Sequence, residues 1–311
     1  MTALATAAVP ATALDEHGRT WSIRRAWPDK EGRITVEALH PEERHARGGR
    51  MRGDAVELAP LGEDRRLPAL AQAARSGTVL VHRLGRRAVV REHGGGAFRK
   101  IVRPGRADSI AAASAPSGWP SGFALARVLD ADEQSVRFAA LPGRTLRALG
   151  AERGTAWVEA WQGFARAWAA VPAATTSIAV EHGPEREAAV LLAWARMAAP
   201  LGPHPLALRQ RAERLAEQLQ DGGDQPLRPA HRDLHDGQVL WHPEHGLALL
   251  DLDTAALAEP ALDLGNLLAH VDWRARQGGL HPLRSARIRS MLQRTAVDAG
   301  VDPERMRLAE R

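Results

Sequence analysis

The sequence predicts an α+β fold in which a β-rich part precedes a helical part. Two observations predict this order. Strand-like segments with alternating apolar residues occupy much of residues 20–140, and segments with apolar residues at steps of three and four dominate the remainder. A chain of 311 residues is long enough for two packed lobes and an appendage. We therefore expect an N-terminal tail and small β-rich module at residues 1–76, a β-rich lobe at 77–142 and a helical lobe at 143–311.

Composition excludes several classes of protein. No apolar run reaches the roughly 18 to 20 residues of a membrane span, and the absence of cysteine excludes disulfides and thiolate sites, so a cytoplasmic location fits best. The N-terminus, MTALATAAVPATAL, lacks a basic start and a solid apolar core, and we expect a loose tail rather than a signal peptide. The net charge of +5 comes from arginines scattered among Glu and Asp. We interpret them as solvated surface rather than a nucleic-acid-binding face.

The N-terminal module is predicted from one hairpin and two shorter elements. Alternating apolar positions flank a PDKEG turn in residues 20–39, which is typical of a hairpin. The polar, Gly- and Arg-rich segment 40–53 is expected to be a connection. AVELAP (55–60) then predicts a strand, and LPALAQAA (67–74) predicts a short helix. The residues themselves do not indicate what this module does.

The β-rich lobe begins with three strand-like segments: TVLVHRLGRR, AVVREH and AFRKIVRP. The glycines of residues 94–96 fall between the second and third segments. A tight turn needs such permissive residues, and a glycine cluster alone is a weak phosphate-loop motif, so we favour the turn. The segment FALARVLDADEQSVRFAA then predicts two further strands around an acidic turn.

The helical lobe is predicted from periodic apolar residues. Trp157, Trp161, Phe164 and Trp168 share one helix face, and such an aromatic stripe is typical of a core. Further helices are expected at 185–199, 205–220 and 263–277, followed by two more, the last opening at Asp302 and Pro303 in cap and first-turn positions. The helix at 205–220 should place these residues inward: Leu208, Ala212, Leu215 and Leu219.

The segment RPAHRDLHDGQVLWHPEHGLALLDLD (228–253) has the spacing of a phosphoryl-transfer site. A polar loop lies between short apolar strands, and the later strand ends on two carboxylates, Asp251 and Asp253. An aspartate in such a loop, Asp233, can accept a hydroxyl proton. An amide oxygen five residues later, from Gln238, can reach a metal ion that Asp251 holds against nucleotide phosphates. The central histidines lack H-E-x-x-H spacing, so we do not predict zinc at these residues: His231, His235, His242 and His245.

This segment resembles the aminoglycoside phosphotransferase and choline kinase superfamily. HRDLHDGQ is similar to the family's H-x-D-x-x-x-x-N loop, with Gln238 in place of Asn, and EPALDLGNLLAH is similar to its P-x-x-D-L helix opening. The resemblance implies a two-lobed protein-kinase-like fold with a β-rich nucleotide lobe, a helical C-terminal lobe and an N-terminal β-rich extension. It also implies that His231 braces the loop and that Asp263 is structural.

The resemblance implies a nucleotide site in the β-rich lobe. Lys100 lies in the third strand, where kinases place the lysine that binds the α- and β-phosphates. Lys30 is the only other lysine, so a compact ammonium persists where a planar guanidinium would not fit. The usual helix Glu partner is missing, and either Asp108 replaces it or the pair is not formed. Gly85 and Arg86 would cover the phosphates.

The LPGRTL segment is similar to the family's hinge between the lobes, so backbone groups at Ala139 and Leu141 would contact adenine. The expected function is an ATP- or GTP-dependent, Mg²⁺-requiring O-phosphotransferase. Its acceptor would be a small hydroxylated molecule such as a sugar, amino sugar, aminoglycoside or amino alcohol, although acid and base are nearly balanced across the helices, unlike a pocket for a polycation.

Two other interpretations remain open at this stage. The missing Glu and the Asn-to-Gln change fit a nucleotide-binding pseudokinase that acts as a regulator or scaffold. Alternatively, the N-terminal module caps the acceptor of a sugar kinase. For the phosphotransferase, the expected partners are a nucleotide and a small-molecule acceptor, with no nucleic acid and no membrane, and the sequence gives no indication of oligomeric state.

Overall fold

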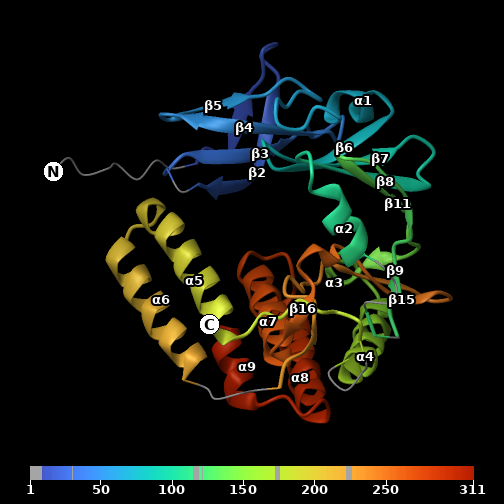
Figure 1. Ribbon diagram of the computed structural model, residues 1–311, viewed down its shortest axis with the longest axis vertical. Coiled ribbons are helices and arrows are strands. Elements are labelled where there is room, and N and C mark those ends of the chain that lie inside the picture. Colours follow the sequence, from blue (N-terminus) through green and yellow to red (C-terminus); the bar gives the residue numbers. More distant parts are fainter. Residues whose placement is uncertain (1–8, 30, 115–118, 121, 172–175, 222–225) are drawn as a thin grey trace. The chain divides into compact units, whose positions relative to one another are not determined.

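The structure is a computed structural model, and the residues it describes are 9–29, 31–114, 119–120, 122–171, 176–221 and 226–311 (Figure 1). They pack as two compact units, which are described separately. Unit 1 lies within residues 1–112, 128–140 and 192–212, and unit 2 within residues 113–127, 141–191 and 213–311. The sequence-based division at residues 76 and 142 stays a prediction.

Unit 1 begins with a five-stranded antiparallel sheet, here called the N-terminal sheet. Its strands pair in chain order: β1 (Thr12–Leu14), β2 (Thr20–Pro28), β3 (Ile34–Leu39), β4 (Ala46–Arg52) and β5 (Ala55–Leu58). Trp21, Ile34 and Val36 are buried in a small core of this sheet. The predicted hairpin at 20–39 and the strand at 55–58 are therefore confirmed.

Two predictions for this region are wrong. The segment 40–53 is not merely a connection, because it contains β4, and part of the supposed tail forms the edge strand β1; the tail's residues 1–8 lie outside the described residues. Arg47 explains how so polar a strand can be central. Its guanidinium is buried against the Trp21 ring, 5.0 Å away, and donates hydrogen bonds to Asp15 and Glu16, so its charge is neutralised inside the sheet.

The second sheet of unit 1 carries the predicted nucleotide lobe. Its order is β10 (Val128–Ala131), β11 (Ser135–Ala139), β8 (Ala97–Val102), β7 (Arg87–Glu92) and β6 (Gly77–Arg83), all antiparallel. Two short helices accompany it, α1 (Leu70–Arg75) and α2 (Ala107–Ala113). Gly94 and Gly95 have positive φ between β7 and β8, which confirms the turn. The predicted strands and the first short helix are thus present.

The helices confirm most of the periodicity argument. They are α3 (Leu146–Ala151), α4 (Ala156–Ala169), α5 (Pro184–Ala198), α6 (Pro205–Gln220), α7 (Pro260–Arg276), α8 (Pro282–Asp298) and α9 (Pro303–Ala309), with a 3₁₀ turn at Ala199–Leu201. The aromatic stripe of α4 is buried, and the Asp302 side chain caps α9. Leu208 is 39% exposed, so its inward placement was wrong. None of these described helices is both long and apolar enough to cross a bilayer.

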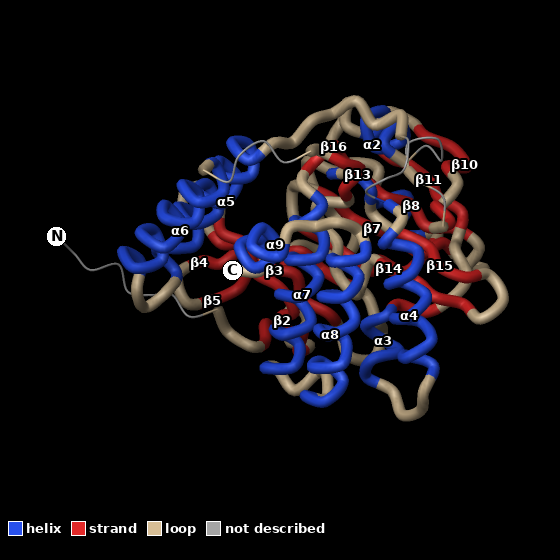
Figure 2. Tube along the Cα trace, turned by 90° about the horizontal axis from the view of Figure 1, so that it is seen from below, coloured by secondary structure: helices blue, strands red, loops and turns tan. Residues whose placement is uncertain are grey.

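Unit 2 also contains two small sheets, one of four strands and one of two, in the part of the chain that the structure describes. One has the order β12 (Arg144–Thr145), β14 (Val239–His242), β15 (Gly246–Leu249) and β9 (Ala124–Leu125); the other pairs β13 (Arg228–Ala230) with β16 (Ala256–Ala258). Helices α7 and α8 run side by side in unit 2 (Figure 2). The main core lies between these helices, α4 and β15, and the predicted catalytic loop, residues 231–238, connects β13 to β14.

Several arginines of unit 2 are structural, which corrects their interpretation as solvated surface. Arg305 of α9 is buried and donates two hydrogen bonds to the Glu259 carboxylate, at 2.9 and 2.6 Å. The same guanidinium donates to the backbone oxygens of Gln218 and Leu219 at the end of α6, each at 3.0 Å. One side chain therefore fastens α6, α9 and the residue preceding α7 together.

We predict that Arg305→Ala lowers the free energy of unfolding by about 3–5 kcal/mol, because Glu259 would remain buried without its partner. Arg307 of the same helix offers a matched control. Its ion pair with Glu304 is exposed, so Arg307→Ala should change stability by less than about 1 kcal/mol. Urea titrations of the three proteins measure both effects. Equal losses in the two variants would contradict the buried-pair assignment.

Candidate active site

The predicted catalytic loop of unit 2 is held by one buried carboxylate. Asp263, in the first turn of α7, accepts the backbone N–H of His231 and of Arg232, each at 2.8 Å. Burial raises the pKa of Asp263, while these two N–H groups and the nearby cations favour its charged form. The structural role expected for Asp263 is therefore visible in its contacts.

His231 connects the loop to the strand that carries the other acids. Its Nε2 lies 2.8 Å from the Leu250 carbonyl oxygen, and its Nδ1 accepts the Asp233 backbone N–H at 3.3 Å. The proton must therefore be on Nε2, which donates to Leu250. Thr254 adds a hydrogen bond from Oγ1 to the His231 carbonyl oxygen, at 3.0 Å. Asp233 thus follows a backbone that is fixed from several sides.

Left-handed backbone marks both halves of this site. Arg232 has φ 66° and Asp251 has φ 59°; among the described non-glycine residues, Arg44 alone shares this region. Such conformations cost about 1–3 kcal/mol and persist where surrounding contacts enforce them, often at functional sites. One precedes Asp233 and the other is Asp251 itself. No pattern in the sequence had indicated this strain.

The hairpin of β14 and β15 places Gln238 beside the end of the second strand. Val239 pairs with Leu249, and the Leu250 N–H donates to the Gln238 carbonyl oxygen at 2.9 Å. Gln238 therefore lies opposite the residue that precedes Asp251, and Asp253 follows in a 3₁₀ turn. Two carboxylates and an amide oxygen are hard ligands, and this donor set fits Mg²⁺.

A second charge network beneath the loop escaped the sequence analysis. Asp236 is fully buried, accepts Arg147 Nε at 3.2 Å and forms an ion pair with Arg274. Arg274 also donates to the backbone oxygens of Arg147 and Gly279, at 3.1 and 2.8 Å. These partners are far apart in the chain, so no local spacing could have indicated them. The network fixes the second half of the loop to α3 and α7.

The predicted nucleotide-binding residues lie mostly in unit 1. Lys100 is buried on β8, where it is paired with Val89 of β7 and Val136 of β11. Gly85 and Arg86 form the turn between β6 and β7. The predicted adenine contacts are Ala139, which ends β11, and Leu141, which begins the next part of unit 2, while Asp108 lies in the first turn of α2.

Comparison with known proteins identifies the family. A model described as the phosphotransferase enzyme family matches residues 66–308, more than half of the chain. The chain belongs to this family. No curated protein matched it significantly. As the family implies, the chain is a phosphotransferase of the small-molecule kinase type.

Solved structures confirm the fold of this phosphotransferase. Aminoglycoside phosphotransferase APH(3'')-Id from Streptomyces rimosus is 18% identical, with a TM-score of 0.55 over 78% of this chain and 94% of that one. An aminoglycoside-3'-phosphotransferase of type VIII is 20% identical, with a TM-score of 0.56 over 79% and 97%. A glucosamine kinase in complex with glucosamine, ADP and inorganic phosphate is 18% identical and aligns over 99% and 90%, with a TM-score of 0.43. The two aminoglycoside phosphotransferase structures show the kinase-like α+β fold.

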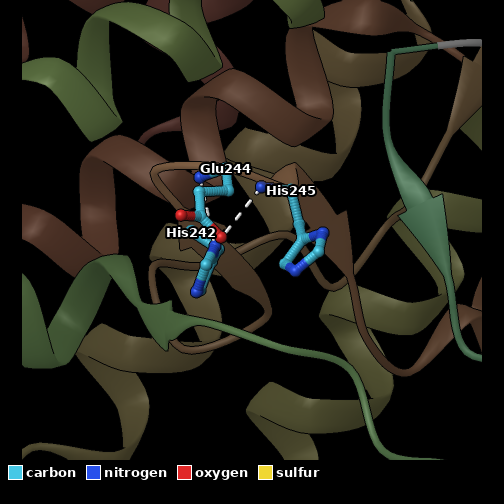
Figure 3. Close-up of side chains that lie close together, drawn as sticks. All are labelled: His242, Glu244 and His245. Carbon is cyan, nitrogen blue, oxygen red and sulfur yellow. Dashed lines mark hydrogen bonds between the residues drawn. The ribbon is translucent and has the colours of Figure 1, made fainter.

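Three potential metal ligands of the phosphotransferase gather at the turn between β14 and β15. Ligand atoms of His242, Glu244 and His245 lie within 4.8 Å of one another (Figure 3). His242 Nδ1 accepts the backbone N–H of Glu244 at 3.1 Å and of His245 at 3.3 Å. These hydrogen bonds close the hairpin and account for the position of the His242 ring.

His235 of the predicted catalytic loop and His270 of α7 are held in their neutral form. The rings of His235 and His270 lie 4.8 Å apart. Burial, followed by the proximity of His270, lowers the pKa of His235 to about 4, and burial also lowers the pKa of His270. Neither His235 nor His270 therefore adds a positive charge to the loop near neutral pH.

We predict that this arrangement makes stability fall in mild acid. An unfolded histidine takes up a proton near its ordinary pKa of about 6.5, whereas folded His235 does so only near 4. Between these values the unfolded chain binds more protons, so stability decreases as the pH falls through this window. His235→Gln should reduce the loss between pH 7 and pH 5 by about 1 kcal/mol, allowing for partial solvent screening.

Urea unfolding at both pH values measures this loss. His17→Gln is the control, because the side chain of His17 is 70% exposed. Parallel pH dependence in His235→Gln and the wild type would contradict the assignment.

Proposed function

We propose that this phosphotransferase moves the γ-phosphoryl group of ATP or GTP, with Mg²⁺, to a hydroxyl group of a small molecule. The observation that carries the proposal is the bracing of one short loop. Asp233 follows the two N–H groups fixed by Asp263, and Gln238 lies across the hairpin from the residue before Asp251. The proposed proton acceptor and the proposed metal ligands are thus carried by one braced segment of backbone, which supports the proposal.

Asp233 performs the proton transfer in this proposal. Its carboxylate accepts the proton of the acceptor hydroxyl while the hydroxyl oxygen attacks the γ-phosphorus and the nucleoside diphosphate leaves. Little covalent work falls to the chain, because positioning and charge neutralisation carry most of the catalysis of phosphoryl transfer.

The remaining predicted residues bind the donor. Gln238 and Asp251, with Asp253, would hold Mg²⁺, which neutralises phosphate charge. Lys100 would bind the α- and β-phosphates, Gly85 and Arg86 would cover them, and the backbone at Ala139 and Leu141 would contact the base. The position of Lys100 on β8, the central strand of its sheet, supports its part, because protein kinases place the corresponding lysine on a strand of the nucleotide lobe.

The acceptor class is a sugar, amino sugar, aminoglycoside or amino alcohol. Turnover should be measured with a panel of these compounds, and nucleotide binding should be measured in parallel. Nucleotide binding without turnover on any acceptor would favour a regulatory pseudokinase and contradict the proposed activity.

Asp233→Asn should lower kcat by on the order of 10²- to 10⁴-fold, the usual span for loss of a general base. Nucleotide affinity should change little, because Asp233 acts on the acceptor. Initial rates and direct nucleotide binding test the two statements. Asp298→Asn, an exposed change in α8, is the control for loss of one carboxylate. Full activity of Asp233→Asn would remove this residue from the mechanism.

Gln238 departs from the family's Asn and provides a test of the metal site. Mg²⁺ requires near-octahedral oxygen ligands at about 2.0–2.1 Å, so the position of the amide oxygen matters. We expect Gln238→Ala to raise the Mg²⁺ concentration for half-maximal rate, with Gln238→Asn intermediate because its side chain is one methylene shorter. Mg²⁺ titrations at saturating nucleotide give this value. Superimposable curves for the three proteins would show that Gln238 is not a ligand.

A further inference from the structure

The turn between β6 and β7 is clamped on both sides of Gly85. The Gly85 N–H donates to Asp64 Oδ2 at 2.5 Å, and Arg103 Nε donates to the Gly85 carbonyl oxygen at 2.7 Å. Gly85 has φ 67°, a conformation that favours glycine. This turn therefore has a fixed backbone, unlike a glycine-rich loop, which gains its shape from several permissive residues.

The clamp continues into the N-terminal sheet through a buried histidine. His82 Nε2 lies 3.1 Å from Asp64 Oδ2, and His82 Nδ1 accepts the Gly48 N–H of β4 at 2.9 Å. Because Nδ1 accepts, Nε2 carries the proton and donates to Asp64. The His82 backbone N–H donates to Glu37 of β3 at 2.9 Å. Two strands of the N-terminal sheet are thus connected to Gly85 through His82 and Asp64.

The Asp64 carboxylate is suited to this role. Its side chain is 4% exposed, and Oδ1 accepts the Arg66 N–H at 2.9 Å. Burial opposes its charge, but hydrogen bonds from His82 and from the Gly85 and Arg66 backbone hold the pKa of Asp64 below its ordinary value. Asp64 therefore stays an acceptor at neutral pH, and each of its bonds is charge-assisted.

Packing of Gly48 against the turn is equally close. A Cβ atom added at Gly48 would lie 2.9 Å from Leu84 Cβ and 3.1 Å from the Leu84 nitrogen. A Cβ atom added at the next residue, Gly49, would instead lie 2.8 Å from the Glu57 oxygen and 2.9 Å from Leu58 Cδ2. A side chain at position 48 would therefore press on Leu84, directly before Gly85. A side chain at position 49 would press on residues of the N-terminal sheet.

Guanidinium groups crowd around this turn. Burial and then the charges of Arg86 and Arg87 lower the pKa of Arg83 to about 10. Burial and then the charges of Arg86 and Arg66 lower the pKa of Arg103. Repulsion of this kind is relieved by an anion with several oxygens, and guanidinium geometry matches phosphate oxygens. The turn is therefore suited to a polyphosphate.

We propose that the N-terminal sheet serves the nucleotide side of the reaction: through Gly48, His82 and Asp64 it holds the Gly85 turn and its arginines in position for the β- and γ-phosphates. This inference rests on the proposed function. It differs from an acceptor cap, because the sheet acts on donor phosphates and not on the acceptor. Gly48, His82 and Asp64 are positioning residues that act through the turn.

Adjacent glycines supply a matched pair of variants in the full chain. Gly48→Ala pushes on Leu84 and displaces the turn, whereas Gly49→Ala strains the N-terminal sheet alone. Calorimetric titration of each protein with AMP, ADP and ATP in the presence of Mg²⁺ measures the consequence. We expect Gly48→Ala to weaken ADP and ATP binding about tenfold, or about 1.4 kcal/mol, with AMP unchanged. Gly49→Ala should bind all three like the wild type.

Asp64→Asn is the second variant and does not introduce a clash. Its amide has one oxygen, so it cannot accept the three hydrogen bonds now made to the two carboxylate oxygens. It should show the same selective loss for ADP and ATP, and it keeps the test decisive if Gly48→Ala does not fold. Acceptor KM should be unchanged in each folded variant.

The outcomes separate the two proposals. Wild-type protein that binds no nucleotide would contradict the proposed function and this inference together. If the wild type binds nucleotide, three results would overturn the inference and leave the proposed function standing. The variants could lose affinity equally for AMP, ADP and ATP, or Gly48→Ala and Gly49→Ala could have equal effects. The third result is a change in acceptor KM alone.

Discussion

Two hydrogen bonds from successive N–H groups to Asp263 are the contacts on which the predicted catalytic loop depends. They hold His231 and Arg232 in a conformation in which Arg232 has a positive φ. A residue with a Cβ atom rarely keeps a positive φ unless surrounding contacts enforce it. From this fixed start, His231 reaches the end of β15 and Asp236 reaches α3 and α7. The loop is therefore a rigid part of the helical core, and the backbone that carries Asp233 is fixed by groups that have no role in the proposed proton transfer.

The sequence predicted those parts of the fold in which local pattern and burial agree. The Trp157 to Trp168 stripe, the hairpin at residues 20–39 and the strands around Lys100 all have the period of their element. Strand β4 was missed because Arg47 is buried beside acids more than thirty residues earlier in the chain. Its neutralisation depends on tertiary contacts, which a short window of sequence does not contain.

The candidate site likewise contains residues that the sequence could predict and residues that it could not. Asp233, Gln238 and Asp251 could be named because they follow a fixed spacing between two short strands. Asp236 stands in the same eight-residue motif, yet its partners Arg147 and Arg274 come from distant helices, so its structural role could not be predicted. The contribution of the N-terminal sheet was hidden for a similar reason, since Gly48 and His82 meet only in the folded chain.

The Arg305 clasp also has a consequence for synthesis of the chain on the ribosome. Glu259 directly precedes α7, the helix that contains Asp263. Its partner, the Arg305 guanidinium, is synthesised 46 residues later. Until then that carboxylate has no partner inside the core, and α7 lacks the contact that joins its start to α6 and α9. Domains commonly fold as units during translation. The start of α7 can therefore gain this contact only after Arg305 has been synthesised.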